Sequence, residues 1–342
     1  FSTQDRHVKE AYFYQKRPGG VVQCGTCPNE CVVLPDNRGK CRTKVNIDGK
    51  LCTISFGNPC AVHVDPVEKK PLYHFHPGTP VLSIATAGCN LHCRNCQNWQ
   101  LSQRGGEEME KIYRAPPNGV VSAALAEGCQ SIAYTYSDPI VFYEYVYDTS
   151  VLAHEAGMTN VFVTAGYINR KPLQRLCKVL DASNTDLKAF DDGFYRRVSS
   201  ATLQPVLDAL VIQREEGVWL EVTNLVIPTL NDDLAMIRRM SKWIRDNLGE
   251  DTPLHFSGFT PMYRMRNLPH TPTSLLEQAR NEALDAGLHY VYIGNVPGLS
   301  DQTLCPGCGR TVVQRRGYTL VSNHVKHGKC EFCGAQISGR WE

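Results

Sequence analysis

The sequence lacks three features that assign many chains to a class of protein. It has no run of about 18 apolar residues, so it predicts no membrane-spanning helix. Its 36 basic and 34 acidic residues leave a formal net charge of +2, which gives no electrostatic case for binding nucleic acid or an acidic membrane surface. Its opening segment, FSTQDRHVKE, lacks the charged-then-apolar pattern of a signal peptide. It also lacks an initiator methionine, so we expect the numbering to begin after trimming or processing.

Cysteine, by contrast, is abundant, with 15 residues in a chain of 342. A chain of this length can hold one large catalytic domain and one or two small modules. Most of the cysteines fall into tight groups, which favours metal binding in a reducing cytoplasm over disulfide bonds. The three groups are Cys24, Cys27, Cys31 and Cys41; Cys89, Cys93 and Cys96; and Cys305, Cys308, Cys330 and Cys333.

The central group belongs to the stretch Val81–Gln100, VLSIATAGCNLHCRNCQNWQ. Its apolar start predicts a buried strand that breaks at Gly88 and is followed by Cys89, Cys93 and Cys96. Four close cysteines would saturate a zinc ion or a cubane cluster, whereas three on a four-iron cluster leave one iron open to a ligand. The spacing therefore predicts a reactive site, and zinc or a loop of free thiols is the alternative.

The two outer groups predict closed metal sites. The first lies in a segment rich in Pro, Gly, Asn and Asp that cannot bury enough apolar surface to fold alone. We favour structural zinc there; an auxiliary [4Fe–4S] cluster and unligated thiols are alternatives, and Cys52 or Cys60 could replace a ligand. The last group forms two CxxCG knuckles with the spacing of a four-thiolate site, for which we also favour zinc over iron.

Strand-like and helix-like segments alternate from Val81 to Asn295, which predicts a parallel sheet or barrel with its working residues at the carboxyl ends of the strands. We expect Asn231 to cap the helix at 232–247. The predicted strands are Val81–Ala87, Ser131–Ser137, Asn160–Tyr167, Asn184–Phe190, Trp219–Ile227, Pro253–Phe259 and His289–Gly294, and the predicted helices are 117–127, 139–156, 171–182, 203–216, 232–247 and 274–286.

The amino-terminal part gives weaker signals. Residues 4–16 predict a short helix, and KVNIDGKLCTIS predicts a hairpin that turns at Asp48 and Gly49. Residues 57–80 predict a connector in which His74 and His76 are hydrogen-bonded beneath the barrel; a metal site is the alternative.

Polar side chains occupy five strand ends where a simple core would have Val, Ile or Leu. Asp186 and Lys188 share one face of their strand, and burying them unpaired would be costly. They therefore favour a polar, charged ligand, and a buried ion pair that serves only the fold is the alternative.

Several motifs in order along nearly the whole chain resemble the AmmeMemoRadiSam system radical SAM enzymes. They include YHFHPG, CNLHCRNCQNWQ, AYTYSDP, TDLKAF, EVTNLVIPTLND and HYVYIGNVPG. This branch of the radical S-adenosylmethionine (SAM) superfamily is related to the activating enzymes of glycyl-radical enzymes such as pyruvate formate-lyase. The resemblance implies an α/β fold: a partial (β/α)6 TIM-like radical SAM barrel over 57–300, with small Cys-rich metal-binding modules at 1–56 and 301–342, the second like a zinc ribbon or rubredoxin.

The same resemblance implies roles for individual residues. Cys89, Cys93 and Cys96 would hold a [4Fe–4S] cluster whose fourth iron takes the amino and carboxylate groups of SAM. Where relatives have Gly-Gly-Glu, this chain has Tyr136–Ser137–Asp138, so Asp138 would bind the SAM amino group. Asn95 replaces an aromatic residue of many relatives, and Trp99 or Tyr136 could offer a π face to adenine or the sulfonium. Further positions that match the SAM pocket are Thr164, Asp186, Lys188, Thr223 and His255.

The resemblance implies an oxidoreductase that cleaves SAM reductively to a 5′-deoxyadenosyl radical, which abstracts hydrogen from a protein or a small molecule. It also implies an electron donor of the flavodoxin or ferredoxin type and Memo-type and AMMECR-type protein partners. We expect neither a nucleic acid nor a membrane as partner. The alternative is a non-enzymatic, zinc-scaffolded binding protein. Candidate contacts for a small-molecule substrate are Glu221, Asn224, Tyr263, Arg264 and Asn295.

Overall fold

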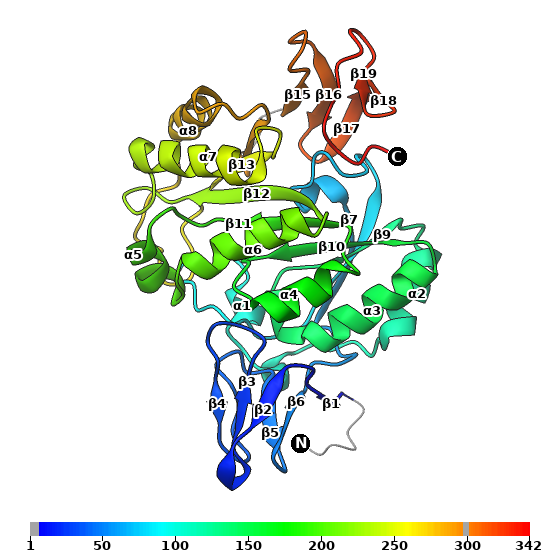
Figure 1. Cartoon of the computed structure of the whole chain (residues 1–342), viewed down its shortest axis with the longest axis vertical. Coiled ribbons are helices and arrows are strands. Elements are labelled where there is room, and N and C mark those ends of the chain that lie inside the picture. The colour runs from blue at the N-terminus through cyan, green and yellow to red at the C-terminus, as the bar shows by residue number, and fades with distance from the viewer. Residues whose placement is uncertain (1–6, 297–300) are drawn as a thin grey trace.

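A computed structural model describes residues 7–296 and 301–342 of the chain. A central α/β layer lies between two small modules made of strands, the amino-terminal one at one end of the long axis and the carboxyl-terminal one at the other (Figure 1). Within these described ranges, no helix is long and apolar enough to cross a bilayer. All fifteen cysteines are free thiols.

The centre of the molecule is one eight-stranded sheet in the order β14-β13-β12-β11-β10-β9-β8-β7. Strands β8 to β14 pair in parallel, which confirms the seven predicted strands, although each is shorter than predicted at its carboxyl end or its start. Their side chains are almost all buried, as expected for a parallel sheet covered on both faces. The bounds are β8 (Pro80–Ala85), β9 (Ser131–Tyr134), β10 (Thr159–Thr164), β11 (Ala182–Asp186), β12 (Trp219–Val226), β13 (Leu254–Gly258) and β14 (Val291–Gly294).

Helical crossovers join the parallel strands, since parallel neighbours cannot be linked by a tight turn. The cap of α7 is Asp233, whose carboxylate accepts from the N–H groups of Ala235 and Met236, so the prediction for Asn231 is wrong. The amide of Asn231 instead donates to the carbonyl of Lys188 over 2.6 Å. The helices are α1 (Trp99–Ser102), α2 (Pro117–Ala126), α3 (Tyr143–Glu155), α4 (Arg170–Cys177), α5 (Asp192–Phe194), α6 (Gln204–Glu215), α7 (Leu234–Leu248) and α8 (Thr273–Asp285).

Residues 57–80 are more than a connector, because β7 (Ala61–Pro66) pairs antiparallel with β8 at the edge of the sheet. The segment then turns under the sheet and buries His74 completely. The ring of His74 lies 2.6 Å from the hydroxyl of Tyr292 and 2.6 Å from the carbonyl of Ser338. The prediction of a hydrogen-bonded histidine is thus confirmed for His74.

The predicted helix at Gln4–Lys16 is wrong over its described part, where β1 pairs with β6 and β2 pairs with β3. Pairing with distant strands outweighs the local helical preference. The predicted hairpin is confirmed: Asp48 (φ +51°) and Gly49 (φ +73°) turn the chain between β5 and β6. The strands are β1 (Lys9–Glu10), β2 (Tyr14–Lys16), β3 (Val22–Cys24), β4 (Val32–Val33), β5 (Lys44–Ile47) and β6 (Lys50–Thr53).

The carboxyl-terminal module is tied to the sheet through the segment that carries His74. The guanidinium of Arg315 donates to the carbonyl of Tyr73 over 2.5 Å, and the N–H of Arg340 donates to the carbonyl of His74 over 2.7 Å. Part of the HYVYIGNVPG motif, Pro297 and Gly298, lies outside the described residues. The strands are β15 (Gln302–Leu304), β16 (Thr311–Arg316), β17 (Thr319–Asn323), β18 (Val325–Lys326) and β19 (Lys329–Cys330).

Candidate functional site

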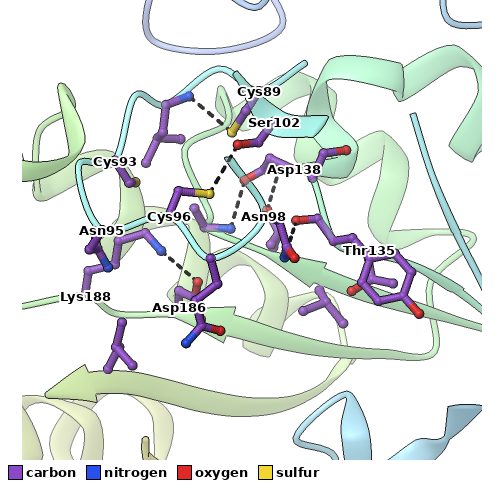
Figure 2. A pocket seen from close by; sticks show the side chains of 18 of the residues that line it. Cys89, Cys93, Asn95, Cys96, Asn98, Ser102, Thr135, Asp138, Asp186 and Lys188 are labelled. Carbon is purple, nitrogen blue, oxygen red and sulfur yellow. Dashed lines mark hydrogen bonds and ion pairs between the residues drawn. The ribbon is translucent and has the colours of Figure 1, made fainter. Parts of the chain in front are cut away.

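A cavity of about 430 Å³ opens at the carboxyl ends of β8, β9, β10 and β11. The three cysteines of the central group reach it from the loop after β8, and polar side chains reach it from the ends of the next three strands (Figure 2). Residues predicted from the sequence that line this cavity are Cys89, Cys93, Cys96, Tyr136, Ser137, Asp138, Thr164, Asp186 and Lys188. The fold thus brings side chains that are a hundred residues apart in sequence to one site.

The cysteine loop is fixed on two sides. Gly88 adopts φ +96°, and a side chain there would place Cβ only 2.4 Å from the carbonyl oxygen of Cys41, so only glycine fits. On the other side, the N–H of Arg94 donates to the carbonyl of Val198 over 2.9 Å. These contacts hold Cys89 and its two partners at the cavity wall.

The chemistry of the three thiols fits a metal cluster. Burial raises the pKa of Cys89 well above its usual value, and nearby Asp138 and Cys93 raise it further. Burial also raises the pKa of Cys93, although the ammonium of Lys188 lowers it in part. Buried thiols of this kind become thiolates only when a cation compensates them, and a bound metal supplies that charge.

The spacing of the sulfurs differs between the loop cysteines and the carboxyl-terminal cysteines. Among the described residues, only Cys305, Cys308, Cys330 and Cys333 place three or more metal-binding atoms within 4.8 Å of one another. A single zinc ion needs sulfurs about 3.8 Å apart, because each Zn–S bond is about 2.3 Å long. The sulfurs of Cys89, Cys93 and Cys96 are not all within 4.8 Å of one another, so they do not form the compact ligand set of one zinc ion.

Asp138 joins the ends of β9 and β10. Its Oδ1 accepts from the hydroxyl of Thr164 over 3.0 Å and from the N–H of Ile140 over 3.2 Å, and its Oδ2 accepts from the N–H of Ala165 over 2.9 Å. Burial raises its pKa, and these donors oppose that shift. Since a carboxylate can accept about four hydrogen bonds, Asp138 has room for one more donor from the cavity.

Asp186 and Lys188 form an ion pair at the end of β11, with 2.7 Å between Nζ and Oδ2. The carboxylate of Asp186 is 38% exposed, so the pair is not confined to the core. Burial opposes ionisation of Lys188, but the carboxylate of Asp186 and the thiol of Cys93 together raise its pKa. The cavity therefore presents both signs of charge beside the cysteines (Figure 2).

Asn95, which lies between Cys93 and Cys96, lines the cavity with a side-chain oxygen that no described residue satisfies. The residue is only 8% exposed. A buried polar atom without a partner costs about 1–3 kcal/mol, so this oxygen indicates a donor that belongs to a ligand or a bound water.

The two candidate aromatic residues differ in placement. Tyr136 (φ +65°) lines the cavity, its hydroxyl donates to Asp65, and the ammonium of Lys70 lies 4.7 Å from its ring centroid. The ring of Trp99 is instead stacked on Tyr263, with centroids 5.2 Å apart, and Trp99 is not among the residues that line the cavity. Trp99 therefore packs the loop and offers no face to a ligand there.

Two positions predicted for the SAM pocket, Thr223 and His255, do not line this cavity. The hydroxyl of Thr223 donates to Asn184 over 2.9 Å. Nε2 of His255 lies 2.7 Å from Oε2 of Glu221. The other carboxylate oxygen of Glu221 accepts from the backbone N–H of His74 over 2.8 Å. The His74 segment thus fills the part of the sheet that these side chains face.

The substrate candidates Glu221 and Asn224 are fully buried and line neither this cavity nor the second one. Asn295 lines a second cavity of about 790 Å³ beside the first. The sequence did not point to three further residues of the first cavity, which are Lys69, Lys70 and Tyr318. Among the described residues, only Tyr318 lines both cavities. Of these three residues, only the adjacent lysines Lys69 and Lys70 could have been noticed in the sequence, as a basic pair ahead of β8.

The carboxyl-terminal cysteines form a compact set. The sulfurs of Cys305 and Cys333 lie 3.6 Å apart, and those of Cys308 and Cys330 lie 3.9 Å apart. These separations fit one tetrahedral ion held by four thiolates. The amino-terminal Cys24, Cys27, Cys31 and Cys41 are not brought together at that spacing.

The sequence is similar to those of several known proteins. Residues 83–240 match the profile of the radical SAM superfamily. The chain is 43% identical over 334 residues to an uncharacterized protein of Methanocaldococcus jannaschii. The aligned region makes up 96% of this chain and 99% of that protein. It is 24% identical over 168 residues to the pyruvate formate-lyase-activating enzyme of Clostridium pasteurianum, and this alignment covers 46% of this chain and 67% of that enzyme.

Solved structures resemble parts of the chain more weakly. A domain of a pyruvate-formate lyase-activating enzyme from Bacteroides vulgatus aligns with a TM-score of 0.43 and 13% identity, over 48% of this chain and 98% of that domain. SuiB of Streptococcus suis bound to S-adenosylmethionine aligns with a TM-score of 0.48 and 12% identity, over 67% of this chain and 52% of SuiB.

Proposed function

Since the chain belongs to the radical SAM superfamily, we propose that it is an activating-enzyme-like oxidoreductase that cleaves SAM reductively and uses the resulting radical on a substrate. The observation that carries this proposal is the convergence of Cys89, Cys93 and Cys96 on one cavity with Asp138 and Lys188. The open sheet with helical crossovers supports a partial (β/α)6 barrel of the kind expected for such enzymes.

When bound at these cysteines, a [4Fe–4S] cluster would supply the single electron needed to split SAM into methionine and a 5′-deoxyadenosyl radical able to take hydrogen from a substrate. Cys89, Cys93 and Cys96 would hold that cluster. Asp138, with one acceptor position still free toward the cavity, would accept from the SAM amino group. Lys188 would balance the anionic thiolates and the SAM carboxylate, because its ammonium is already held beside Cys93 by Asp186.

The remaining wall residues would orient and protect the bound SAM. The orphaned oxygen of Asn95 would accept from one of its N–H or O–H groups, which makes up for the cost of burying that oxygen. Leu91, Val163 and Leu225 line the same cavity with apolar surface. They would keep water away from the reacting carbon, which limits side reactions.

A cavity of about 430 Å³ suits one ligand of the size of SAM. The second cavity, about 790 Å³, lies across Tyr318 and would admit the substrate, either a small molecule or a protein segment. We further propose the AmmeMemoRadiSam branch, a cytoplasmic location, a flavodoxin- or ferredoxin-type donor, and Memo-type and AMMECR-type partners. The order of the motifs along the chain supports the branch and the partners that it implies, and the tight cysteine groups support a reducing cytoplasm. At the carboxyl-terminal cysteines we propose zinc, which the compact sulfur spacing supports.

The test is metal content and SAM binding after anaerobic reconstitution. We compare the unchanged protein with Cys93→Ala and with Cys177→Ala, a buried cysteine outside every group. We expect Cys93→Ala to lose about four irons per chain and to lose SAM binding, whereas Cys177→Ala should keep both. Unchanged iron and SAM binding in Cys93→Ala, or zinc in place of iron at the central site, would contradict the proposal and favour the zinc-scaffold alternative.

A further inference from the structure

Two lysines line the first cavity without a role in the proposed binding of SAM. Lys69 ends the 3-10 turn at Val67–Lys69, which follows β7, and Lys70 comes next. Both side chains line the cavity. The side chain of Lys70 is only 2% exposed, and that of Lys69 is 45% exposed. Because a buried ammonium is costly unless an anion compensates it, the charges around this pair indicate what it can bind.

Asp65 is the carboxylate that both lysines share. Its Oδ1 accepts from Lys69 over 2.7 Å, and its Oδ2 accepts from Lys70 over 2.6 Å. Oδ2 also accepts from the hydroxyl of Ser83 over 2.9 Å and from the hydroxyl of Tyr136. Asp65 thus accepts about as many hydrogen bonds as a carboxylate can. One negative charge faces two positive charges, and the described part of the chain brings no second carboxylate within 4.0 Å of either ammonium.

The pKa of Lys70 reflects this imbalance. Burial lowers that pKa to about 8, the hydrogen bond and charge of Asp65 oppose the shift, and the charge of Lys69 lowers it further. Lys188, in the same cavity, has one carboxylate for its one ammonium, since its Nζ lies 2.7 Å from Oδ2 of Asp186. A lysine ammonium has three donor hydrogens, and among the described residues Lys70 gives one of them, to Asp65. An anion in the cavity would supply the missing charge and accept from the remaining donors.

The lysine pair and the cysteines reach the cavity from opposite ends of β8. Asp65 pairs with Val81 near the start of that strand, whereas Cys89 follows its end. From Val81 to Ala85 the strand spans about 13 Å, at about 3.3 Å per residue. A ligand that fills the cavity can therefore meet the cysteines with one part and the lysines with another.

The segment that carries the lysines also packs against the hairpin of Tyr318. A Cβ at Gly78 would lie 2.8 Å from Cδ2 of Leu320, so the segment and the hairpin are in contact. Tyr318, at the turn between β16 and β17, lines both cavities. Tyr73, on the same segment as Lys70, lines the second cavity. The lysines therefore lie where the first cavity borders the second one.

SAM itself offers no anion for this end of the cavity. Its one carboxylate is the group that we assign to Lys188, beside the cysteines. Its sulfonium is positive and its adenosine has no negative charge, so the rest of SAM gives a pair of ammonium groups nothing to attract. A second ligand, bound together with SAM, would provide the anion.

We propose that Lys69 and Lys70 form an anion subsite that binds a carboxylate or phosphate group of the substrate. The proposal rests on the proposed radical SAM function and names the class of its substrate, a compound with an anionic oxygen group. That group accepts hydrogen bonds from the two ammonium groups and balances their charge. The rest of the substrate then lies between the subsite and the second cavity, past Tyr318.

The experiment titrates simple anions into the reconstituted full chain, with saturating SAM and no reductant, so that SAM is bound and not cleaved. The probes are inorganic phosphate and acetate, and potassium chloride at equal ionic strength is the reference. The rise of the thermal unfolding midpoint with anion concentration gives the affinity. We expect phosphate or acetate to bind and chloride not to bind. The probe that binds more tightly identifies the anionic group, and either order supports the proposal.

Lysine variants separate the subsite from the general stabilising effect that phosphate has on proteins, which all variants share. Lys70→Met should weaken binding of the tighter probe at least about tenfold, because a charge-assisted hydrogen bond is lost. Lys69→Met, at the more exposed lysine, should weaken it in the same direction and decides the matter if Lys70→Met does not fold. Lys178→Met, at an exposed lysine outside the cavity, should match the unchanged protein. Equal binding in Lys69→Met and Lys178→Met would overturn the proposal.

Competition with SAM gives a second way to overturn it. If phosphate and acetate bind only the SAM-free protein and are displaced by SAM, the lysines serve the carboxylate of SAM and not a substrate. Failure of the proposed radical SAM function looks different, because the unchanged protein would then bind no SAM at all. In that case, titration of the SAM-free protein still measures the affinity of Lys69 and Lys70 for the anion, so the two failures can be distinguished.

Discussion

The ammonium of Lys188 lies 2.7 Å from the carboxylate of Asp186, and the two side chains line the cavity together with the three loop cysteines. The carbonyl of Lys188 accepts from the amide of Asn231, which fixes the backbone just after β11. A charged pair held this firmly at a cavity wall is positioned to meet a charged ligand.

Replacing Lys188 therefore has a defined consequence. In Lys188→Met we expect the affinity for SAM to fall about 10–100-fold, because a charge-assisted hydrogen bond is worth about 1.5–3 kcal/mol. Titration calorimetry on the anaerobic, reconstituted protein measures it. Lys178→Met, at an exposed lysine of the same chain, is the control and should bind SAM normally. Equal affinities in the two variants would remove Lys188 from the site.

Replacing Asn95 should affect the stability of the protein and its affinity for SAM in different ways. Leucine has nearly the same shape but no buried oxygen to satisfy, so Asn95→Leu should leave the apo protein as stable as before, or up to about 1 kcal/mol more stable. The same change should weaken SAM binding about tenfold, because the acceptor is lost. The thermal unfolding midpoint without SAM measures the change in stability, and its increase on adding SAM measures the change in binding. A loss of stability without SAM would mean that the oxygen serves the fold alone.

Gly88 tests the contact between the two cysteine groups. A Cβ there would lie 2.4 Å from the carbonyl oxygen of Cys41, whereas a Cβ at Gly128 (φ +68°) meets nothing within 4 Å. Gly128→Ala should therefore lose only the roughly 1 kcal/mol due to its positive φ. We expect Gly88→Ala to lose several kcal/mol more in urea unfolding and to release the amino-terminal module to proteolysis. Equal losses would show that the two segments are not packed together.

Stability should fall in mild acid because of His74. Burial lowers the pKa of His74 to about 4, and Glu221 opposes that shift. The unfolded chain, with an ordinary histidine pKa of about 6.5, therefore binds more protons between these two values, and the folded state loses about 3 kcal/mol as pH falls from about 6.5 to about 4. His74→Gln should flatten this slope by about one proton. His327→Gln, at an exposed histidine, should leave it unchanged; an unchanged slope in His74→Gln would contradict the assignment.

The sheet could be predicted because its signal is local. Apolar runs such as Val81–Ala85 and the amphipathic helix at 234–248 carry their structure in their own periodicity. The amino-terminal strands could not be predicted in the same way. Residues 9–10 and 14–16 become strands only by pairing with β6 and β3, at separations of 42–44 and 6–10 residues respectively.

The candidate site, like the fold, could be predicted from the sequence where its signal is local and could not where it depends on long-range packing. Side chains that follow β8, β9 and β11 meet at one edge of the sheet, as expected for parallel strands. Thr223 and His255 do not line the cavity, because the His74 segment folds back and occupies the space that they face, a long-range packing event that no strand pattern records. Tyr318 was missed for a related reason: a residue of the distant carboxyl-terminal module reaches the cavity only in the folded chain.

The formation of 5′-deoxyadenosine tests the central claim most directly. Anaerobically reconstituted protein is mixed with SAM and excess dithionite, and the product is quantified by liquid chromatography beside a Cys93→Ala control. We expect 5′-deoxyadenosine and methionine from the unchanged protein and neither from Cys93→Ala. A protein that binds neither iron nor SAM at this site, and yields no product, would contradict it.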